Sequence, residues 1–506
     1  MPAGNGARGD TPPSYVRENP PLTRENASLM REKTFGLRRE KAFRLQISRS
    51  AVSYLLNTRE QQQAMLAYLG VSSLEELFVA VPSEVRLRRP LRLPPAATEL
   101  ELHSQLEELA RQNLSAAQYP CFLGGGAYDH FIPAVVEAIA SRSEYYTAYT
   151  PYQAEASQGT LQVIFEYQTL LCQLTGLGVA NASLYEAGSG VAEAVLMALG
   201  VTGRQEGEVL VAETVHPEYR RVLGTYLANL ACRLRVLPTP EGFLDPDDLK
   251  AALGERTAVL VVQSPNFFGH LEEVAELAAA VHRVGGVCIA VFDPISLGLL
   301  RRPGDCGVDI AVAEGQGLGI PLGYGGPYLG ILACRDDPAY LRRLPGRLVG
   351  QTTDRQGRRC WVLTLQTREQ HIRRENATSN ICTNQGLMAL RASVYLTALG
   401  PQGLRETAEL CRRKAHYAAQ RLAEVAGAEL RFRRPFFKEF TLRWPGPVEP
   451  LPRQLRQRGF LAALPLGRWF PHLADCFSLA VTEKRTCAEI DALAEALAQC
   501  RMTSRS

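Results

Sequence analysis

The sequence predicts an α/β protein built on a large, mainly parallel sheet, and two observations lead to that prediction. From Glu208 onward, short apolar runs alternate with segments of helical length, which is typical of a parallel sheet with helices on both faces. One of these runs ends in Asp293, and a later run, at residues 309–313, opens into a glycine-rich loop. The strands before that loop are expected at residues 209–212, 234–237, 258–263 and 287–292.

The acid and the glycine-rich loop together indicate a more specific fold. They are typical of the aminotransferase-like fold (fold type I) of enzymes that use pyridoxal phosphate. In that fold an acid pairs with the pyridinium nitrogen, and a lysine in the later loop forms the Schiff base. The lysine is missing here, because none lies between Lys250 and Lys414. We therefore expect that the chain does not hold pyridoxal phosphate covalently in its own pocket.

Composition excludes several classes of protein. The 506 residues can bury a large core, and the fractions of hydrophobic (46%) and charged (21%) residues are ordinary. A net charge of +4 predicts neither nucleic-acid binding nor attraction to a membrane, and no apolar run is long enough to span one. The 12 cysteines are dispersed without zinc spacing, so we predict no metal site and expect reduced thiols in the cytoplasm.

The chain divides into four predicted segments. Residues 1–57 read as a disordered N-terminal extension, because their composition offers little apolar surface to bury. Residues 58–112 read as a helical arm that wraps another surface, opened by a capping box of Thr58 and Gln61. Residues 113–385 form the large domain without its Schiff-base lysine. Residues 386–506 form a smaller α+β domain, with a helix broken at Gly400, strands at 437–444 and 476–480, and a terminal helix.

Polar residues at strand ends and at one helix start are candidates for a cofactor pocket. Ligands gather at the carboxyl ends of parallel strands, where His216 and Asp293 fall. Glu186 and Ser189 stand among small residues at a helix start, where such folds bind the cofactor phosphate. Each also has a structural alternative: a polar strand end, a hydrogen-bonded packing histidine, or small-residue packing. Without a lysine in the loop, we favour the structural roles.

A tyrosine-rich segment, residues 145–155, is the other candidate site. Its phenols, amide and acid suit either packing at a subunit contact or a polar wall beside a small-molecule site. The residues concerned are Tyr145, Tyr149, Tyr152, Gln153 and Glu155.

Several long stretches resemble the glycine cleavage system P-protein, and specifically subunit 1 of its split, two-chain form. They are YYTAYTPYQAEASQGTLQ (145–162), VHPEYR (215–220), QSPNFFG (263–269), FDPISLGLL (292–300), EGQGLGIPLGYGGPYLG (314–330) and LTLQTREQHIRRENATSNICTNQ (363–385). One departure is Asn376, where the family usually has lysine. The resemblance extends more weakly from about residue 58 to 500.

The resemblance implies the activity, the cofactor and the partners. The family decarboxylates glycine on pyridoxal phosphate and passes the aminomethyl group to the lipoyl arm of H-protein. In split forms, subunit 2 carries the cofactor lysine in a motif like HKTFCIPHGGGGPG, which places Gln316 at or next to the equivalent position here. The implied assembly is a heterotetramer of two plus two subunits. The tyrosine-rich segment would then line the partner's active site across the interface.

Two other functions stay open at this point. One is a non-catalytic scaffold or regulatory pseudoenzyme with the same fold. The other is a free-standing pyridoxal phosphate enzyme with its lysine in an unusual place, against which the absence of lysine from the loop argues.

Overall fold

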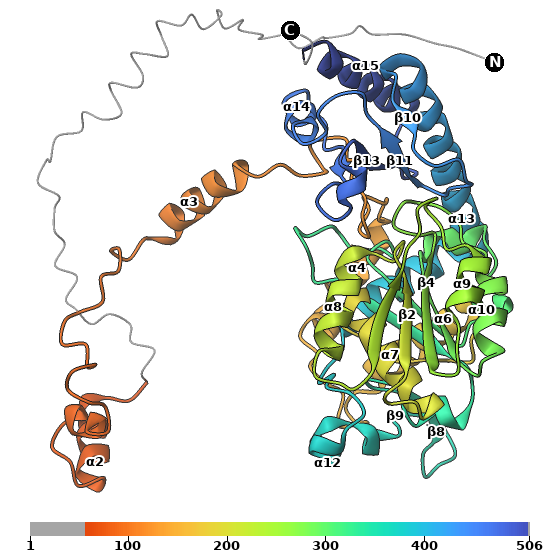
Figure 1. Ribbon diagram of the computed structural model, residues 1–506. Coiled ribbons are helices and arrows are strands. Elements are labelled where there is room, and N and C mark those ends of the chain that lie inside the picture. Colours follow the sequence, from red (N-terminus) through yellow and green to blue (C-terminus); the bar gives the residue numbers. More distant parts are fainter. Residues whose placement is uncertain (1–55, 504–506) are drawn as a thin grey trace, which may run out of the picture. The chain divides into compact units, whose positions relative to one another are not determined.

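A computed structural model describes residues 56–503 (Figure 1). This part of the chain belongs to two compact units, one ending at Leu102 and the other beginning at His103. The extension expected at residues 1–57 lies almost wholly outside the described residues and stays a prediction. No helix between Arg59 and Thr503 is long and apolar enough to cross a membrane.

The first helices of the described chain bury none of their side chains. Helix α2 (Arg59–Tyr68) starts at the predicted capping box, in which the Thr58 hydroxyl accepts from the Gln61 N–H and the Gln61 amide oxygen accepts from the Thr58 N–H. A 3₁₀ turn, η1 (Leu74–Phe78), and helix α3 (Glu99–Arg111) follow. Helices this short are only marginally stable in isolation. Their apolar side chains are exposed, so we expect these helices to pack against another surface.

The large sheet has seven strands in the order β1-β7-β6-β5-β4-β2-β3. The five strands from β2 to β6 run parallel, whereas β7 pairs antiparallel with β6 and β1 pairs antiparallel with β7. The parallel strands lie where the apolar runs predicted them, but the sequence did not indicate β1 or β7. The strands are β1 (Val179–Ala180), β2 (Glu208–Ala212), β3 (Arg233–Leu237), β4 (Thr257–Ser264), β5 (Val287–Phe292), β6 (Ile310–Glu314) and β7 (Gly330–Cys334).

Helices cover both faces of this sheet, as the prediction of a doubly wound fold requires. Successive residues of a strand point to opposite faces, and Val312 of β6 belongs to one hydrophobic core while its neighbour Ala313 belongs to another. The helices of the large domain are α4 (Ala134–Ala140), α5 (Ser143–Tyr146), α6 (Gln158–Thr175), α7 (Ala187–Thr202), α8 (Pro217–Leu227), α9 (Pro246–Ala252), α10 (Val274–His282) and α11 (Pro338–Leu341), with 3₁₀ turns η2 (Ile295–Gly298) and η3 (Gly304–Cys306).

A polar region lies between the seven-stranded and the four-stranded sheet in the sequence and forms a two-stranded sheet of its own. It contains a hairpin and several short turns: β8 (Val349–Thr353), β9 (Arg359–Leu363), η4 (Gln366–Arg368), α12 (Gln370–Arg373) and η5 (Arg374–Asn376). The hairpin lies against α6, because the Gln158 side chain both donates to and accepts from the backbone of Trp361.

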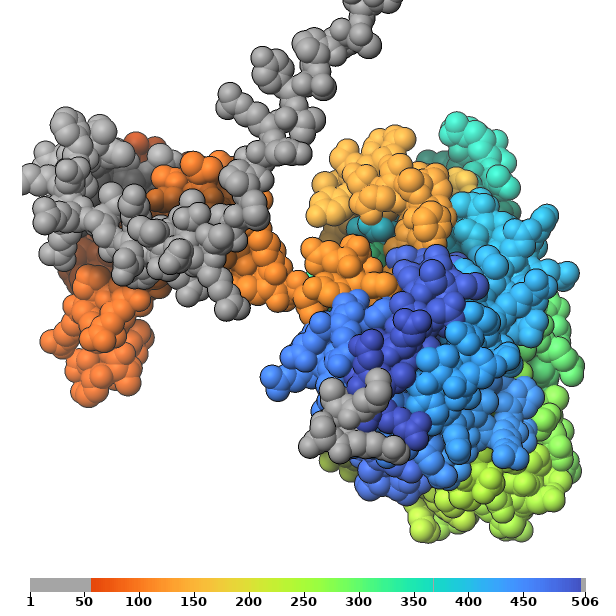
Figure 2. Space-filling model, turned by 90° about the horizontal axis from the view of Figure 1, so that it is seen from above, coloured from red at the N-terminus to blue at the C-terminus, as the bar shows by residue number. Residues whose placement is uncertain are grey.

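The C-terminal part is an α+β domain around a four-stranded antiparallel sheet, in the order β10-β11-β13-β12. The long helix α13 (Gly386–Arg421) breaks at Gly400 as predicted, where φ is 62° and a proline follows. Seen from above, the segments from α13 to α15 form one continuous surface (Figure 2). The remaining elements are η6 (Leu422–Ala426), β10 (Glu429–Leu430), β11 (Glu439–Arg443), α14 (Leu451–Gln457), β12 (Leu464–Pro465), η7 (Pro471–Leu473), β13 (Cys476–Ala480) and α15 (Cys487–Thr503).

The two sheets have separate hydrophobic cores, although residues 103–503 lie in one compact unit. The predicted division at residues 385 and 386 therefore stays a prediction. The domains meet closely at Gly269, whose φ is +89°: a Cβ atom there would lie 1.7 Å from the carbonyl oxygen of Glu439.

We expect Gly269→Ala to lower the free energy of unfolding by more than about 2 kcal/mol, because the side chain would collide with backbone and strain φ. Urea unfolding of the full chain measures the loss. Gly254→Ala is the matched control, since nothing lies within 4 Å of a Cβ atom there. Equal stability of the two variants would contradict the close approach of the domains.

Candidate functional site

A small pocket lies at the carboxyl ends of β4, β5 and β6, where parallel sheets bind ligands. Its free volume is about 40 Å³, which is far below the roughly 300–1,000 Å³ of typical small-molecule sites. Residues of both domains line it, among them Gly126, Tyr128, Tyr219, Gln263, Asn266, Asp293, Glu314, Lys438 and Glu439.

Asp293 is paired with a lysine inside this pocket. Its Oδ2 atom lies 2.7 Å from Nζ of Lys438, and its Oδ1 atom accepts a hydrogen bond from the Ile295 N–H. Lys438 directly precedes β11 of the C-terminal domain, and only 2% of its side chain is exposed. Its ammonium also lies 3.7 Å from the centroid of the Tyr128 ring. The ammonium of Lys438, which lies outside the glycine-rich loop, therefore neutralises the carboxylate of Asp293.

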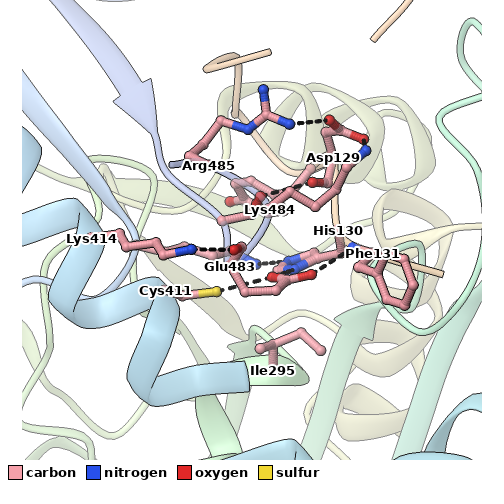
Figure 3. Close-up of polar contacts among 12 residues, drawn as sticks. Asp129, His130, Phe131, Ile295, Cys411, Lys414, Glu483, Lys484 and Arg485 are labelled. Carbon is pink, nitrogen blue, oxygen red and sulfur yellow. Dashed lines mark hydrogen bonds and ion pairs between the residues drawn. The ribbon is translucent and has the colours of Figure 1, made fainter. Parts of the chain in front are cut away.

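The ammonium of Lys438 continues into a buried chain of polar contacts. Nζ lies 2.8 Å from Nε2 of His130. Nδ1 of His130 in turn lies 2.7 Å from Oε2 of Glu483, a contact drawn in Figure 3. An ammonium can only donate, so Nε2 accepts and the imidazole proton sits on Nδ1, which donates to Glu483. The Cys411 thiol, 3.3 Å away, donates to the same carboxylate.

The three groups His130, Cys411 and Glu483 also stand close enough to be considered as metal ligands, since their ligating atoms lie within 4.8 Å of one another. Each of these atoms is already engaged in the contacts above, and the neighbouring ammonium opposes a second cation. The arrangement fits an ion-pair chain better than a metal site.

The N-terminus of α7, the expected phosphate site, is occupied by carboxylates of the chain itself. The Ser189 N–H donates to Oε2 of Glu186 at 2.8 Å, and the Ser189 hydroxyl donates to the same carboxylate. The Ala187 N–H donates to Oε2 of Glu314 at 3.2 Å. Burial raises the pKa of Glu314 to about 8, although three backbone N–H groups donate to it.

Gln316 anchors backbone rather than a ligand. Its side chain is buried, accepts from the Tyr128 N–H at 2.8 Å, and donates to the carbonyl oxygens of Tyr128 and Ile320. These contacts join the glycine-rich loop to the backbone at Tyr128.

His216 is a neutral packing residue at the start of α8. Its Nδ1 accepts from the Glu218 N–H, so the ring proton sits on Nε2 and donates to the carbonyl oxygen of Gly125 at 2.7 Å. The ring stacks on Tyr219 with centroids 4.3 Å apart. Burial lowers the pKa of His216 to about 4. These contacts agree with the structural role that we favoured.

The tyrosine-rich segment lies at the surface and contributes nothing to this pocket. Tyr149 is 89% exposed, and Gln153 and Glu155 are also exposed. Tyr152 is held in place: Arg347, itself buried, donates to its hydroxyl at 3.2 Å and lies over its ring. Of the predicted residues, Asp293 lines the pocket. The tyrosine-rich segment lies at the surface, and the lining of the pocket does not include the others, which are Glu186, Ser189, His216 and Gln316.

Comparison with known proteins decides the family. A family model described as the glycine cleavage system P-protein matches residues 52–497. The chain belongs to the glycine cleavage system P-protein family. Two relatives, from Desulforamulus reducens and Carboxydothermus hydrogenoformans, are each named as probable glycine dehydrogenase (decarboxylating) subunit 1. They are 50% and 51% identical over 446 residues, which is 88% of this chain and 99% of each relative.

Solved structures confirm the predicted fold type I. A crystal structure of a P-protein, the glycine decarboxylase of the glycine cleavage system, in inhibitor-bound form is 45% identical with a TM-score of 0.80. The match covers 88% of this chain and 99% of that one. An aspartate aminotransferase from Thermus thermophilus is 18% identical with a TM-score of 0.53, and this likeness shows the fold alone.

The pocket of this P-protein family member does not fit pyridoxal phosphate. Lys438 holds the acid that a pyridinium nitrogen would need, and Glu186 and Glu314 hold the N–H groups that a phosphate would need. Lys438 does not replace the missing loop lysine, because the ring nitrogen and the aldehyde-bearing carbon stand at opposite ends of the pyridine ring. At or next to the loop position where the Schiff-base lysine would stand, this chain has the amide side chain of Gln316.

Sequence reasoning missed the residues that fill the pocket from the other domain. Lys438 and Glu483 lie in or beside short strands, where a single charged residue carries no local signal. The sequence offered one general signal for Lys438: a buried carboxylate at the end of a strand, such as Asp293, needs a counter-charge.

We expect the isolated chain to show no Schiff-base absorbance after incubation with pyridoxal phosphate, because its pocket is filled. Borohydride reduction and peptide mapping provide the measurement. Labelling at Lys250 or Lys414 outside the pocket counts as nonspecific. A reduced adduct on a pocket residue, Lys438 included, would contradict the assignment.

We expect Glu483 to stabilise the fold in a pH-dependent way. Burial acts to raise its pKa, but the hydrogen bonds from the His130 ring and the Phe131 N–H outweigh burial and lower the pKa. A lowered carboxyl pKa adds stability above the unfolded value near 4.5, and this stability is lost as the pH falls toward 2.

Urea unfolding at several pH values tests this expectation. Glu483→Gln should cost roughly 3 kcal/mol at pH 6, and the difference from the unmodified chain should shrink steadily from pH 4.5 to pH 3. Glu429→Gln, at an exposed acid of β10, should show no such trend. A difference that is independent of pH would refute the role of the charge.

Proposed function

We propose that this chain is subunit 1 of a two-subunit glycine decarboxylase of the glycine cleavage system. Membership of the P-protein family, and matches that span nearly the whole of relatives named subunit 1, support the proposal. In it, a second subunit holds pyridoxal phosphate covalently, decarboxylates glycine, and transfers the aminomethyl group to the lipoyl arm of H-protein. The assembly is a heterotetramer of two chains of each kind.

The observation that carries the proposal is the filled pocket. A family whose reaction depends on pyridoxal phosphate is represented here by a chain whose cofactor positions are occupied by its own side chains. The cofactor must therefore come from another chain. Within the described residues the cysteines form no disulfide, which suits the reducing cytoplasm where we place the enzyme.

The contribution of this chain to the reaction lies in the tyrosine-rich segment. Tyr145, Tyr149 and Tyr152 supply phenol groups, and Gln153 and Glu155 supply an amide and a carboxyl group. The lining of the chain's own pocket does not include these five side chains. The buried Arg347 braces Tyr152 and also binds the carbonyl oxygen of Cys382 and the side chains of Thr383 and Asn384. The segment is thus held firmly while Tyr149 stays open to a partner. We propose that it lines the active site of subunit 2 across the interface.

The helical arm supplies a second contact in this proposal. The apolar residues Leu102, Leu106 and Leu109 follow one another at helical spacing on α3 and are all exposed. We propose that the arm covers a surface of subunit 2.

A non-catalytic scaffold is the alternative, and the filled pocket favours it as well, because its polar groups are engaged with one another rather than open to a substrate. The two functions differ in what the tyrosine-rich segment does. Co-expression with a subunit 2 followed by a glycine–bicarbonate exchange assay tests the first: the pair should exchange bicarbonate, and each chain alone should not.

We expect Tyr149→Phe and Glu155→Gln each to lower turnover of the assembled enzyme about tenfold or more, equivalent to roughly 1.4 kcal/mol in transition-state stabilisation. Assembly should persist, because neither change removes much apolar surface. Size-exclusion chromatography measures assembly, and bicarbonate exchange measures turnover. Glu429→Gln serves as the control for loss of a surface charge. Normal exchange by both variants would leave the chain a scaffold.

A further inference from the structure

We propose that the remnant pocket is a cation site whose resident ligand is the ammonium of Lys438, and that this internal ligand holds the C-terminal domain closed on the large domain. The proposal goes beyond the function of the assembled enzyme, since it concerns this chain alone. The class of ligand that the site accepts is a small primary alkylammonium ion.

The first support is that the ammonium has a complete set of partners. A lysine ammonium has three N–H donors, and three acceptors surround this one. They are the carboxylate of Asp293 at 2.7 Å, Nε2 of His130 at 2.8 Å, and the face of the Tyr128 ring at 3.7 Å. A carboxylate, a neutral imidazole and an aromatic face are the groups that recognise an ammonium ion.

The second support is burial. The side chains of Lys438 and Asp293 are 2% and 13% exposed, so neither charge can rely on water if the other is removed. A buried charge without a partner is costly, and removing one member of a buried pair destabilises a protein strongly. The pair is therefore a requirement of the closed fold, unlike the many surface pairs of this chain.

The third support is that several contacts join the part of the chain before residue 386 to the part after it. Asp293 and His130 belong to the large domain, whereas Lys438 and Glu483 flank strands of the C-terminal sheet. Beside them, Lys484 and Arg485 bind Asp129 at 2.6 and 3.2 Å (Figure 3). Two stretches of the C-terminal domain, one at Lys438 and one at residues 483–485, therefore contact the segment at residues 128–131.

Chemical rescue distinguishes a cation site from a merely structural side chain. Lys438→Ala keeps Cβ and removes a group whose shape and charge match n-propylammonium. Thermal unfolding of the full chain is followed with n-propylammonium chloride, and with tetramethylammonium chloride at equal ionic strength. We expect the substitution to lower Tm by about 5 °C or more, and n-propylammonium alone to restore at least half of the loss.

Lys250→Ala is the matched control. Lys250 also contacts two carboxylates, Asp247 at 2.8 Å and Glu276 at 3.2 Å, but its side chain is 43% exposed. Its replacement should change Tm by no more than about 1 °C, with no response to n-propylammonium. Equal rescue by both salts, or none by either, would overturn the proposal.

A double-mutant cycle covers the case in which Lys438→Ala does not fold. Lys438→Met and Asp293→Asn each leave one buried group without its partner, whereas the combined variant leaves no unpaired charge in the pair. We expect the double variant to unfold at a higher temperature than Lys438→Met alone. Additive losses would show that the two groups act independently, and the proposal would fail.

Discussion

The carboxylate of Asp293 stands at the end of a buried strand, and a charge in that place needs a counter-charge. Here the counter-charge comes from Lys438, on a different domain and far away in the sequence. Much of the surrounding geometry follows from that need. Strand β11 must approach the end of β4 closely enough for the ammonium to enter, and this is possible because Gly269 has no side chain to obstruct the backbone of Glu439.

A similar need for a partner of opposite charge exists at the start of α7, where the N–H groups carry partial positive charge. Free N–H groups at the start of α7 attract negative charge or hydrogen-bond acceptors, and the carboxyl groups of Glu186 and Glu314 accept from them, although burial raises the pKa of Glu314 to about 8. An amide then completes the set at Gln316, where both its donor and its acceptor are used by backbone. The groups that a cofactor would contact in this fold are thus engaged by side chains and backbone of the chain itself.

Much of the fold could be predicted from the sequence, because the parallel strands are continuous apolar runs. The break in helix α13 at Gly400 could also be predicted, because a proline follows that glycine. The antiparallel strand β7 could not, since its pairing with β6 depends on the path of the glycine-rich loop between them. Of the site, Asp293 and Glu186 were candidates because they stand at a strand end and a helix start, and Gln316 was a candidate because of the family resemblance. Lys438 and Glu483 were not, because their role arises only when two domains meet.

The sequence distance between the members of this buried chain sets the order in which the protein can mature. His130 contacts Lys438 across 308 residues and Glu483 across 353. During synthesis the ribosome must finish nearly the whole polypeptide before the acid at residue 293 can be neutralised. Until the segment that carries Lys438 has been synthesised, Asp293 of the nascent chain has no lysine to pair with, so the closed pocket can form only late in translation or after it.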